Sequence, residues 1–97
     1  MKLITEKQQE RIPELYAQES VSDPIVYLKI TCMNAFWLIT ELDKGKGLAF
    51  GYAQIIEGGG ELGYISLEEI NELRENYYVS VKAVEEPLSK LKAEFGL

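Results

Sequence analysis

The sequence predicts an α+β fold in which an antiparallel meander of four to five strands carries two to three helices on one face. Three observations lead to this prediction. Several stretches alternate between apolar and polar or small residues, which is the period-two pattern of β-strands. Short polar or glycine-bearing links separate these stretches and favour antiparallel neighbours. Helix signals lie before, between and after the strands, which predicts the order α-β-β-β-β-α-β-α within a single domain of 97 residues.

The first predicted helix runs from about Glu6 to Arg11. Thr5 and Gln8 have the spacing of a capping box, in which each side chain bonds to the other residue's backbone N–H. Pro13 cannot lie deep inside a helix because its ring clashes with the preceding turn, so we expect a break before it and a further turn starting at it. The apolar residues of this region are expected to dock on the sheet; they are Ile12, Leu15 and Tyr16.

Five strands are predicted over residues 25–32, 35–42, 48–56, 62–65 and 77–84. Apolar residues recur at every second position in most of them, which gives the sheet an apolar face. The links between the first four strands are short. The third link, Gly58–Gly60, supplies the backbone freedom that a tight reversal needs. The fifth strand is expected to rejoin the sheet after a helix.

Two further helices are predicted, over residues 67–75 and from Pro87 onward. Ser66 precedes the first of them and is followed three residues later by Glu69, which is the spacing of a capping box. Pro87 is expected at the first position of the second helix, where its missing N–H would be unpaired in any case. Apolar residues at helical spacing give each helix one buried stripe. The stripes are Leu67, Ile70 and Leu73 in one helix, and Leu88, Leu91 and Phe95 in the other.

One glycine motif has the pattern of a nucleotide-binding site. Gly58, Gly60 and Gly63 match the spacing of the dinucleotide fingerprint G-x-G-x-x-G. That fingerprint works when a helix begins inside the motif and points its N-terminus at a pyrophosphate. Here the third glycine leads into Tyr64 and Ile65, which are predicted as strand, and no phosphate-loop lysine follows. We therefore interpret the glycines as a solvent-facing hairpin turn and predict no nucleotide or other cofactor.

Composition argues against several classes of function. The chain has no histidine, which removes histidine-based triads, the usual zinc sites and a histidine pH switch. Cys32 is the only cysteine and has no histidine to activate it, so we interpret it as a buried apolar residue. No stretch has the length and hydropathy of a membrane helix or a secretory signal. These features predict a cytoplasmic protein without a metal or a catalytic centre.

The net charge of −6 is concentrated in one segment, since residues 57–75 hold six glutamates against one arginine. No basic patch is present to neutralise phosphates, so we expect no direct binding of nucleic acid. We predict a non-enzymatic interaction domain whose acidic surface meets a basic protein partner. That surface comprises Glu57, Glu68, Glu69, Glu72 and Glu75. Two alternatives remain open: the charge serves solubility only, or the protein is an acidic DNA mimic that occupies a DNA-binding groove in counter-defence.

A second hypothesis places a ligand site on the sheet. By alternation, four residues share the polar side of two neighbouring strands, and a fifth joins them if its strand pairs in the right register. They are Tyr27, Lys29, Trp37 and Glu41, with Glu61 as the fifth. A lysine, two carboxylates and two aromatic side chains on one face could bind a small polar ligand or form an enzymatic site. The alternative is a solvated face with cross-strand lysine–glutamate pairs.

Several motifs resemble a known family. The matching pieces in the first half of the chain are Pro13-x-Leu15-Tyr16-x-Gln18-Glu19, Tyr27-x-Lys29, and Trp37 with Glu41-x-Asp43. The most specific pieces are Phe50-Gly51 and Glu61-Leu62-Gly63-Tyr64-x-Ser66-Leu67-x-Glu69. In these the chain is similar to a small bacterial family, common on plasmids and other mobile elements, known as domain-of-unknown-function family 2958. The resemblance implies a bacterial or mobile-element origin and no established activity. Near the C-terminus that family tends to show an acidic-basic-acidic run, and Tyr78-Val79-Ser80 stands in its place here.

Overall fold

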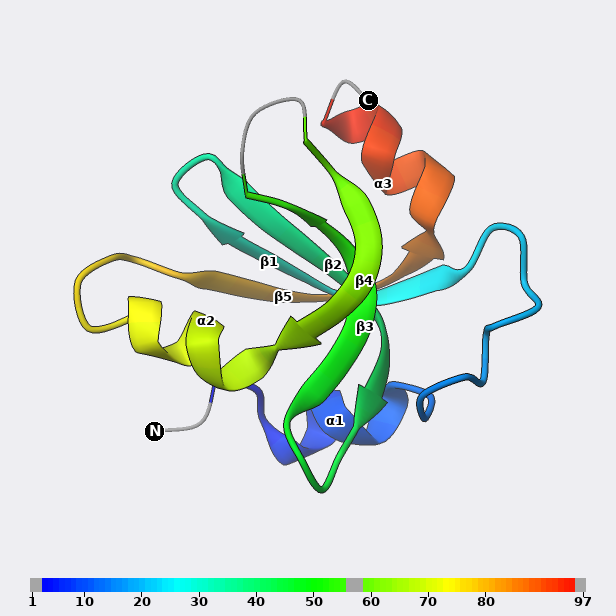
Figure 1. The fold of residues 1–97 in the computed structure, drawn as a ribbon, viewed down its shortest axis with the longest axis horizontal. Helices are drawn as coiled ribbons and strands as arrows, with labels where there is room; N and C mark the ends of the chain where they lie inside the picture. The colour runs from blue at the N-terminus through cyan, green and yellow to red at the C-terminus, as the bar shows by residue number, and fades with distance from the viewer. Residues whose placement is uncertain (1–2, 56–58, 96–97) are drawn as a thin grey trace.

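The structure, a computed structural model, describes residues 3–55 and 59–95. The elements follow one another in the predicted order, so the α+β class and the element order are confirmed (Figure 1). The helices are α1 (Glu6–Arg11), α2 (Leu67–Leu73) and α3 (Leu88–Glu94). The strands are β1 (Ile25–Cys32), β2 (Ala35–Asp43), β3 (Leu48–Gln54), β4 (Glu61–Ser66) and β5 (Ser80–Pro87).

The strands form one five-stranded antiparallel sheet in the order β4-β3-β2-β1-β5. Strands β1 to β4 make the predicted meander, and β5 returns to pair with the outer side of β1. Figure 1 shows a strongly twisted sheet, in which β3 and β4 curve across the direction of β1 and β5. This topology leaves β4 and β5 as the two edges of the sheet.

Local signals in the N-terminal segment act as predicted up to Ile12. The Thr5 hydroxyl accepts a hydrogen bond from the Gln8 N–H at 3.1 Å, and the Gln8 side chain accepts one from the Thr5 N–H at 3.0 Å. Ile12 then leaves the helix in an extended conformation and is buried. The following turn begins at Leu15 rather than at the proline, and Tyr16 is 61% exposed instead of docked on the sheet.

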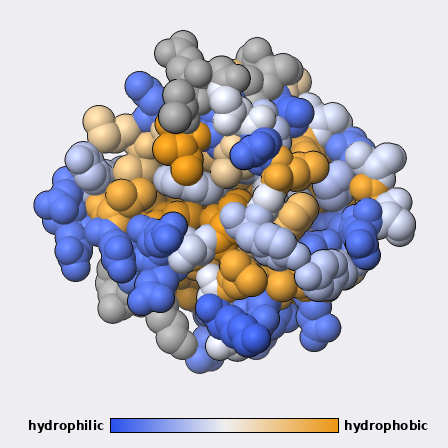
Figure 2. All heavy atoms as spheres, in the orientation of Figure 1, coloured by the Kyte–Doolittle hydropathy of each residue, from blue (hydrophilic) through white to orange (hydrophobic). Residues whose placement is uncertain are grey.

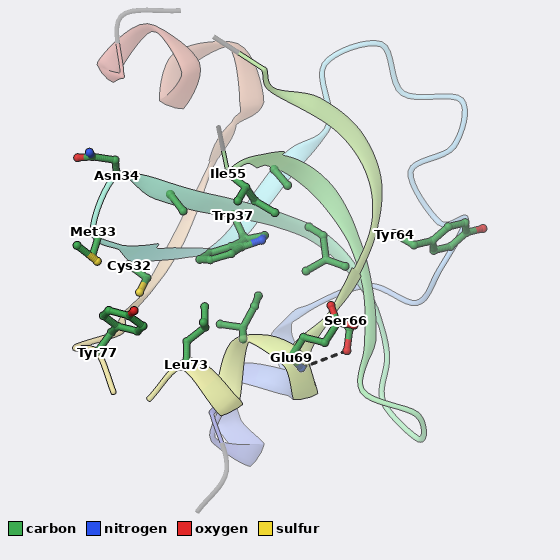
Figure 3. Close-up of a pocket in the computed structure, with 14 residues that line it drawn as sticks. Cys32, Met33, Asn34, Trp37, Ile55, Tyr64, Ser66, Glu69, Leu73 and Tyr77 are labelled. Carbon is green, nitrogen blue, oxygen red and sulfur yellow. Dashed lines mark hydrogen bonds between the residues drawn. The ribbon is translucent and has the colours of Figure 1, made fainter. Parts of the chain in front are cut away.

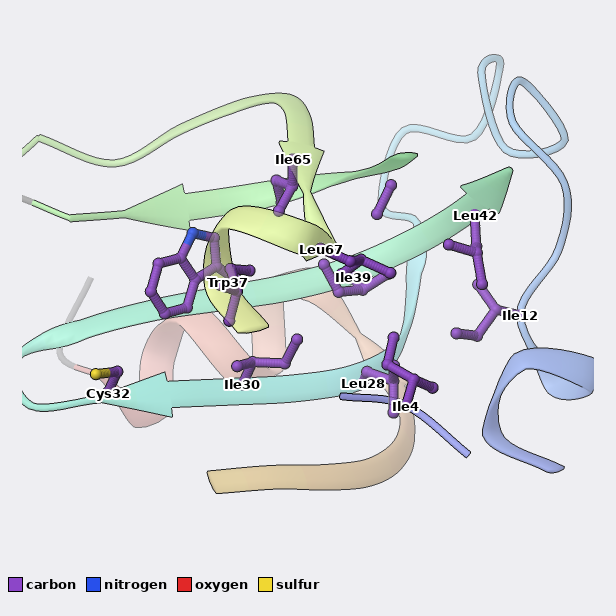
Figure 4. Close-up of a cluster of buried hydrophobic side chains, with 12 residues drawn as sticks. Ile4, Ile12, Leu28, Ile30, Cys32, Trp37, Ile39, Leu42, Ile65 and Leu67 are labelled. Atoms are coloured by element: carbon purple, nitrogen blue, oxygen red, sulfur yellow. The ribbon is translucent and has the colours of Figure 1, made fainter. Parts of the chain in front are cut away.

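Apolar side chains fill both faces of the sheet. Along β2, Trp37 belongs to the cluster that includes α2, whereas Leu38 belongs to a second cluster that includes α3. Figure 4 shows the first cluster, with α2 crossing the strands beside Trp37. The helices were expected to pack on one face of the sheet. Instead, α2 packs on one face and α3 packs on the opposite face. The physical reason is that β2 is buried along nearly its whole length, and a strand buried on both sides needs cover on both sides.

A β-bulge interrupts β2. Its register against β3 shifts between Ile39 and Glu41, which leaves Thr40 as the extra residue. Opposite the bulge, the backbone of Gly51 lies so close to Leu38 that a Cβ atom on the glycine would overlap the Leu38 carbonyl oxygen. The bulge changes the side of the sheet to which every later side chain of the strand points, and this change sets the position of Glu41.

Several element boundaries differ from the prediction. Helix α2 ends at Leu73 rather than at residue 75. Strand β5 spans Ser80–Pro87 rather than residues 77–84, and it pairs with β1 from Ile25 to Thr31. Pro87 consequently pairs with Ile25 and becomes the N-cap of α3 instead of its first residue.

The predicted glycine turn falls partly outside the described residues, which include Gly59 and Gly60 but not Gly58. Gly63 lies inside β4, and α2 begins only at Leu67. The helix thus starts well after the glycine motif, unlike the arrangement in a dinucleotide fingerprint. Within the described ranges, no helix combines the length and the hydropathy that crossing a membrane requires.

Candidate functional site

A groove of about 560 Å³ lies between the sheet and α2 (Figure 3). We call it the α2 groove. Its lining residues are Cys32, Met33, Asn34, Ala35, Trp37, Ala53, Ile55, Tyr64, Ile65, Ser66, Glu69, Ile70, Leu73 and Tyr77. Most of this lining is apolar, so the groove offers a hydrophobic floor to a bound side chain.

The floor of the α2 groove is set by strand register. Trp37 pairs with Ala53 across β2 and β3, and residues paired directly across strands point to the same face. The helix wall is set by the N-cap of α2, where the Ser66 hydroxyl accepts a hydrogen bond from the Glu69 N–H at 3.2 Å. This cap begins the helix directly at the end of β4, and Ile70 then packs in the same cluster as Trp37.

The open end of the α2 groove carries exposed apolar side chains. Met33 is 79% exposed, Ile55 65% and Tyr77 49%, and all three line the groove. Next to Tyr77 in the chain, Tyr78 is 85% exposed. Figure 2 shows apolar side chains gathered on this face and bordered by hydrophilic ones. Large apolar side chains that gather at the rim of a groove are typical of an interaction surface.

One predicted acidic residue lines the same groove. Glu69 lines it directly, and the side chains of Glu68, Glu72 and Glu75 are exposed on or just after α2. The fifth predicted acidic residue, Glu57, lies outside the described residues. The structure thus brings one predicted acidic residue into the wall of an apolar groove. Sequence reasoning missed the groove itself, because its rim comes from three separate links of the chain.

A second cavity, of about 360 Å³, lies on the other side of β4 from α2. We call it the Glu41 pocket. Its lining residues are Leu15, Tyr16, Gln18, Glu19, Val21, Ser22, Pro24, Thr40, Glu41, Phe50, Leu62 and Tyr64. Most of these residues belong to the motif pieces that carry the family resemblance. The loop before β1, the bulge of β2 and the edge strand β4 therefore converge on one place.

The Glu41 carboxylate anchors that loop. The side chain is only 4% exposed, and its two oxygens accept hydrogen bonds from the backbone N–H groups of Tyr16 at 2.8 Å and Gln18 at 2.6 Å. The Gln18 side chain continues the clamp: its amide nitrogen donates to the carbonyl oxygens of Ile25 and Thr40, each at 2.9 Å. Its amide oxygen accepts from the Ile25 N–H at 2.7 Å. Gln18 thereby joins the beginning of β1 to the bulge of β2.

Tyr16 connects the loop to the sheet edge. Its backbone has a positive φ of 72°, a conformation that is sterically costly for an aromatic residue. Its hydroxyl lies 2.7 Å from the hydroxyl of Tyr64. This hydrogen bond, together with desolvation and the nearby carboxylates of Glu19 and Glu41, raises the pKa of Tyr64 above its ordinary value. Figure 3 shows the Tyr64 ring turned away from Trp37 and toward this loop.

The structure divides the five residues predicted to form a site on one sheet face: Tyr27, Trp37 and Glu61 share a face, whereas Lys29 and Glu41 lie away from it. Lys29 pairs with Leu38, so it faces the α3 side, where its Nζ lies 6.0 Å from the centre of the Phe95 ring. Trp37 is buried on the α2 side. A two-residue turn between β1 and β2 fixes this register, and counting back from that turn would have placed Lys29 opposite Leu38.

The remaining members of that set divide between the two faces of the sheet. Glu41 lies beyond the bulge, in its own pocket. Tyr27 is half-buried against the cluster on the α2 side, at a second irregularity, between β1 and β5. Glu61 is exposed at the start of β4, where it pairs with Ala53; because Trp37 pairs with Ala53 from the other side, Glu61 points to the same face as Trp37. The expected shared face is therefore corrected for Lys29 and Glu41, which lie away from Trp37. Of the five residues, Trp37 lines the α2 groove and Glu41 lines its own pocket.

Fold and cavities together define a small α+β domain with an open antiparallel sheet, an apolar groove beside an acidic helix, and a buried carboxylate that organises a loop. The chain belongs to the DUF2958 family of proteins of unknown function, whose sequence profile matches residues 1–89. No curated protein and no solved structure matches the chain.

Proposed function

We propose that this protein is a non-enzymatic interaction domain that holds a basic, apolar-anchored segment of a partner protein in the α2 groove. The observation that carries the proposal is the position of Glu69. This carboxylate lies in the wall of a groove whose floor is apolar, so one site offers burial for an apolar side chain and attraction for a positive charge.

The shape of the groove supports a peptide segment as the partner. Buried apolar residues such as Trp37 and Ile70 form the floor, while exposed Met33 and Tyr77 extend the surface outward. An amphipathic segment that inserts one or two apolar anchors would cover these exposed side chains. Aromatic residues and methionine are the types that interface cores favour.

The charge of α2 supports a basic partner. Glu68, Glu69, Glu72 and Glu75 are all exposed, and Glu68 and Glu72 are spaced four residues apart. Like charges at that spacing destabilise a helix by about 0.2–0.5 kcal/mol per pair. Lysine or arginine flanking the apolar anchor would relieve this repulsion and speed association, and the complex would weaken as salt rises.

The test is a selection of peptides on the immobilised protein, followed by titration of the selected peptides. We expect the selected sequences to combine leucine, phenylalanine or tryptophan with flanking lysine or arginine. NMR shift mapping should place them on the residues of the α2 groove. Raising the salt from about 0.05 M to about 0.5 M should weaken binding several-fold, because exposed charge pairs are screened.

Paired variants separate charge from fold. The double variant Glu69→Lys with Glu72→Lys should weaken peptide binding by roughly tenfold or more, through the loss of attraction at the groove. The control, Glu10→Lys with Glu94→Lys, makes the same change in net charge at exposed positions of α1 and α3. If both double variants bind equally, the acidic surface serves solubility and the proposal fails.

A further inference from the structure

We propose that the Glu41 pocket is a binding site for a free organic cation of alkylammonium type, with a compact apolar body around the positive charge. This inference is independent of the α2 groove. It rests on the aromatic walls of the pocket, on its carboxylates and on its size.

The aromatic walls are arranged as a corner. The rings of Phe50 and Tyr64 stand nearly perpendicular, at 80°, with their centres 5.5 Å apart, and both residues line the pocket. Tyr16 adds a third aromatic residue, held near Tyr64 by the bond between the two hydroxyls. Aromatic rings that surround a small space attract cations through their negative faces, and quaternary ammonium groups bind in such cages.

The charge of the pocket favours a cation. Glu19 and Glu41 both line it, and among the described lining residues there is no lysine or arginine. The two oxygens of Glu41 each accept one backbone N–H bond, which leaves further lone pairs and the whole negative charge. A buried charge is costly until it is paired. A bound cation would supply that partner, while the neighbouring rings would shield it from water.

Size and access select the kind of cation. A volume of about 360 Å³ lies near the lower end of ligand-binding cavities, which suits a small molecule better than a folded partner. Leu62, Val21 and Tyr64 are partly exposed where they line the pocket, so a route from solvent is open and its walls are apolar. Apolar walls disfavour a strongly hydrated inorganic ion and favour an ammonium carrying methyl groups.

The decisive experiment compares choline with 3,3-dimethyl-1-butanol, which has the same shape and no charge. NMR titration of the full chain should show saturable shifts at Tyr16, Phe50 and Tyr64 with choline. The neutral alcohol should bind roughly tenfold or more weakly, the ratio expected for one cation–π and carboxylate site. Equal binding of the two probes would make the site a plain apolar cavity. The absence of saturable shifts up to about 100 mM choline would overturn the proposal altogether.

Variants locate the interaction without unfolding the loop. Replacement of Glu41 risks the fold, because its oxygens hold two backbone N–H groups. Glu19 is exposed and lines the pocket, so Glu19→Gln should leave the fold intact and weaken choline binding by roughly threefold or more. Tyr64→Phe, which keeps the ring, should retain binding better than Tyr64→Leu. Unchanged binding in both Glu19→Gln and Tyr64→Leu would contradict the assignment of the site.

Discussion

The carboxylate of Glu41, in the middle of the sheet, accepts a hydrogen bond at 2.6 Å from the backbone N–H of Gln18, in the loop that precedes the sheet. The same carboxylate accepts a second bond from the Tyr16 N–H. One buried side chain thus supplies hydrogen-bond acceptors for two backbone N–H groups of a loop that has no regular secondary structure. The loop in turn forms one wall of the Glu41 pocket, so the stability of the loop and the shape of the pocket depend on the same contacts.

We predict that Glu41→Gln destabilises the protein by about 2–3 kcal/mol, because a buried donor loses its acceptor. The glutamine amide offers one oxygen and one NH₂ group, so it faces one of the two backbone N–H groups with a donor. Urea denaturation of the variant measures the loss. Glu14→Gln is the matched control, since Glu14 is exposed in the same loop. A cost for Glu41→Gln equal to that of the control would show that the clamp contributes nothing.

Gly51 and Gly63 provide a second matched pair. They face each other across β3 and β4, but a Cβ atom on Gly51 would overlap the Leu38 carbonyl oxygen, whereas one on Gly63 would meet nothing within 4 Å. We predict that Gly51→Ala costs about 3 kcal/mol, because the backbones at the bulge must separate. Gly63→Ala should be neutral or stabilise by about 0.5 kcal/mol, since alanine restricts the unfolded chain. Equal midpoints in thermal unfolding would contradict this difference.

The sequence predicts the local parts of this fold well. The capping residues Thr5 and Gln8 correctly predict where α1 begins, and the alternation of apolar and polar residues correctly predicts both ends of β1. Alternation alone says nothing about which faces of two strands meet, so the shared face for Lys29 and Trp37 failed on register. The apolar residues on both sides of β2 were already visible in the sequence, and they indicate cover on both faces of the sheet.

Long-range contacts explain what the sequence could not predict. Gln18 bonds to Ile25 and Thr40, and nothing in the residues around Gln18 marks these partners. The bulge at Thr40 is equally hidden, because a strand with one extra residue reads like any other strand. The candidate sites depend on such contacts. The acidic residues were therefore found from the sequence, but the groove beside them was not.

Asp23 leads to a prediction about pH. Its two oxygens accept hydrogen bonds from the Ser89 hydroxyl at 2.7 Å and the Ser89 N–H at 3.0 Å, and so cap α3 from a distant loop. These bonds, the hydroxyl first, hold the pKa of Asp23 below its ordinary value of 3.8. A carboxyl group with a lowered folded pKa stabilises the fold above its unfolded pKa, and this stabilisation is lost as pH falls through the folded pKa.

We therefore expect Asp23→Ala to lower the stability at neutral pH, and the difference from the unmodified protein to shrink below pH 3.8. Urea midpoints measured across the acid range provide the comparison. Ser89→Ala removes the hydrogen bond from the hydroxyl and keeps the one from the backbone N–H. The pH dependence of its stability should therefore fall between those of the unmodified protein and Asp23→Ala. A difference that stays constant down to the lowest pH would exclude Asp23 as the titrating cap.

The last prediction concerns the hydroxyl pair of Tyr16 and Tyr64. The hydrogen bond with Tyr16 is the main cause that raises the pKa of Tyr64 above 10.0, with desolvation and the carboxylates of Glu19 and Glu41 adding to it. Tyr16→Phe should therefore lower the pKa of Tyr64 toward 10.0, and Glu19→Gln should lower it less. NMR of proteins labelled with carbon-13 at the tyrosine ring carbon that bears the hydroxyl follows this titration. Tyr78→Phe, at an exposed position that does not contribute to the raised pKa of Tyr64, should leave the titration unchanged.

The sign of the linked stability follows from the direction of that shift. Because the folded state disfavours the Tyr64 phenolate, the contribution to stability is present below the ordinary pKa and is lost as pH rises through the raised one. A cation bound in the Glu41 pocket would favour the phenolate, so choline should lower the pKa of Tyr64 in the unmodified protein. If choline binds away from Tyr64, the titration of Tyr64 will be the same with and without it. Because Tyr64 lines both cavities, the shifts of Tyr16 and Phe50, which line only the Glu41 pocket, separate binding in this pocket from binding at the α2 groove.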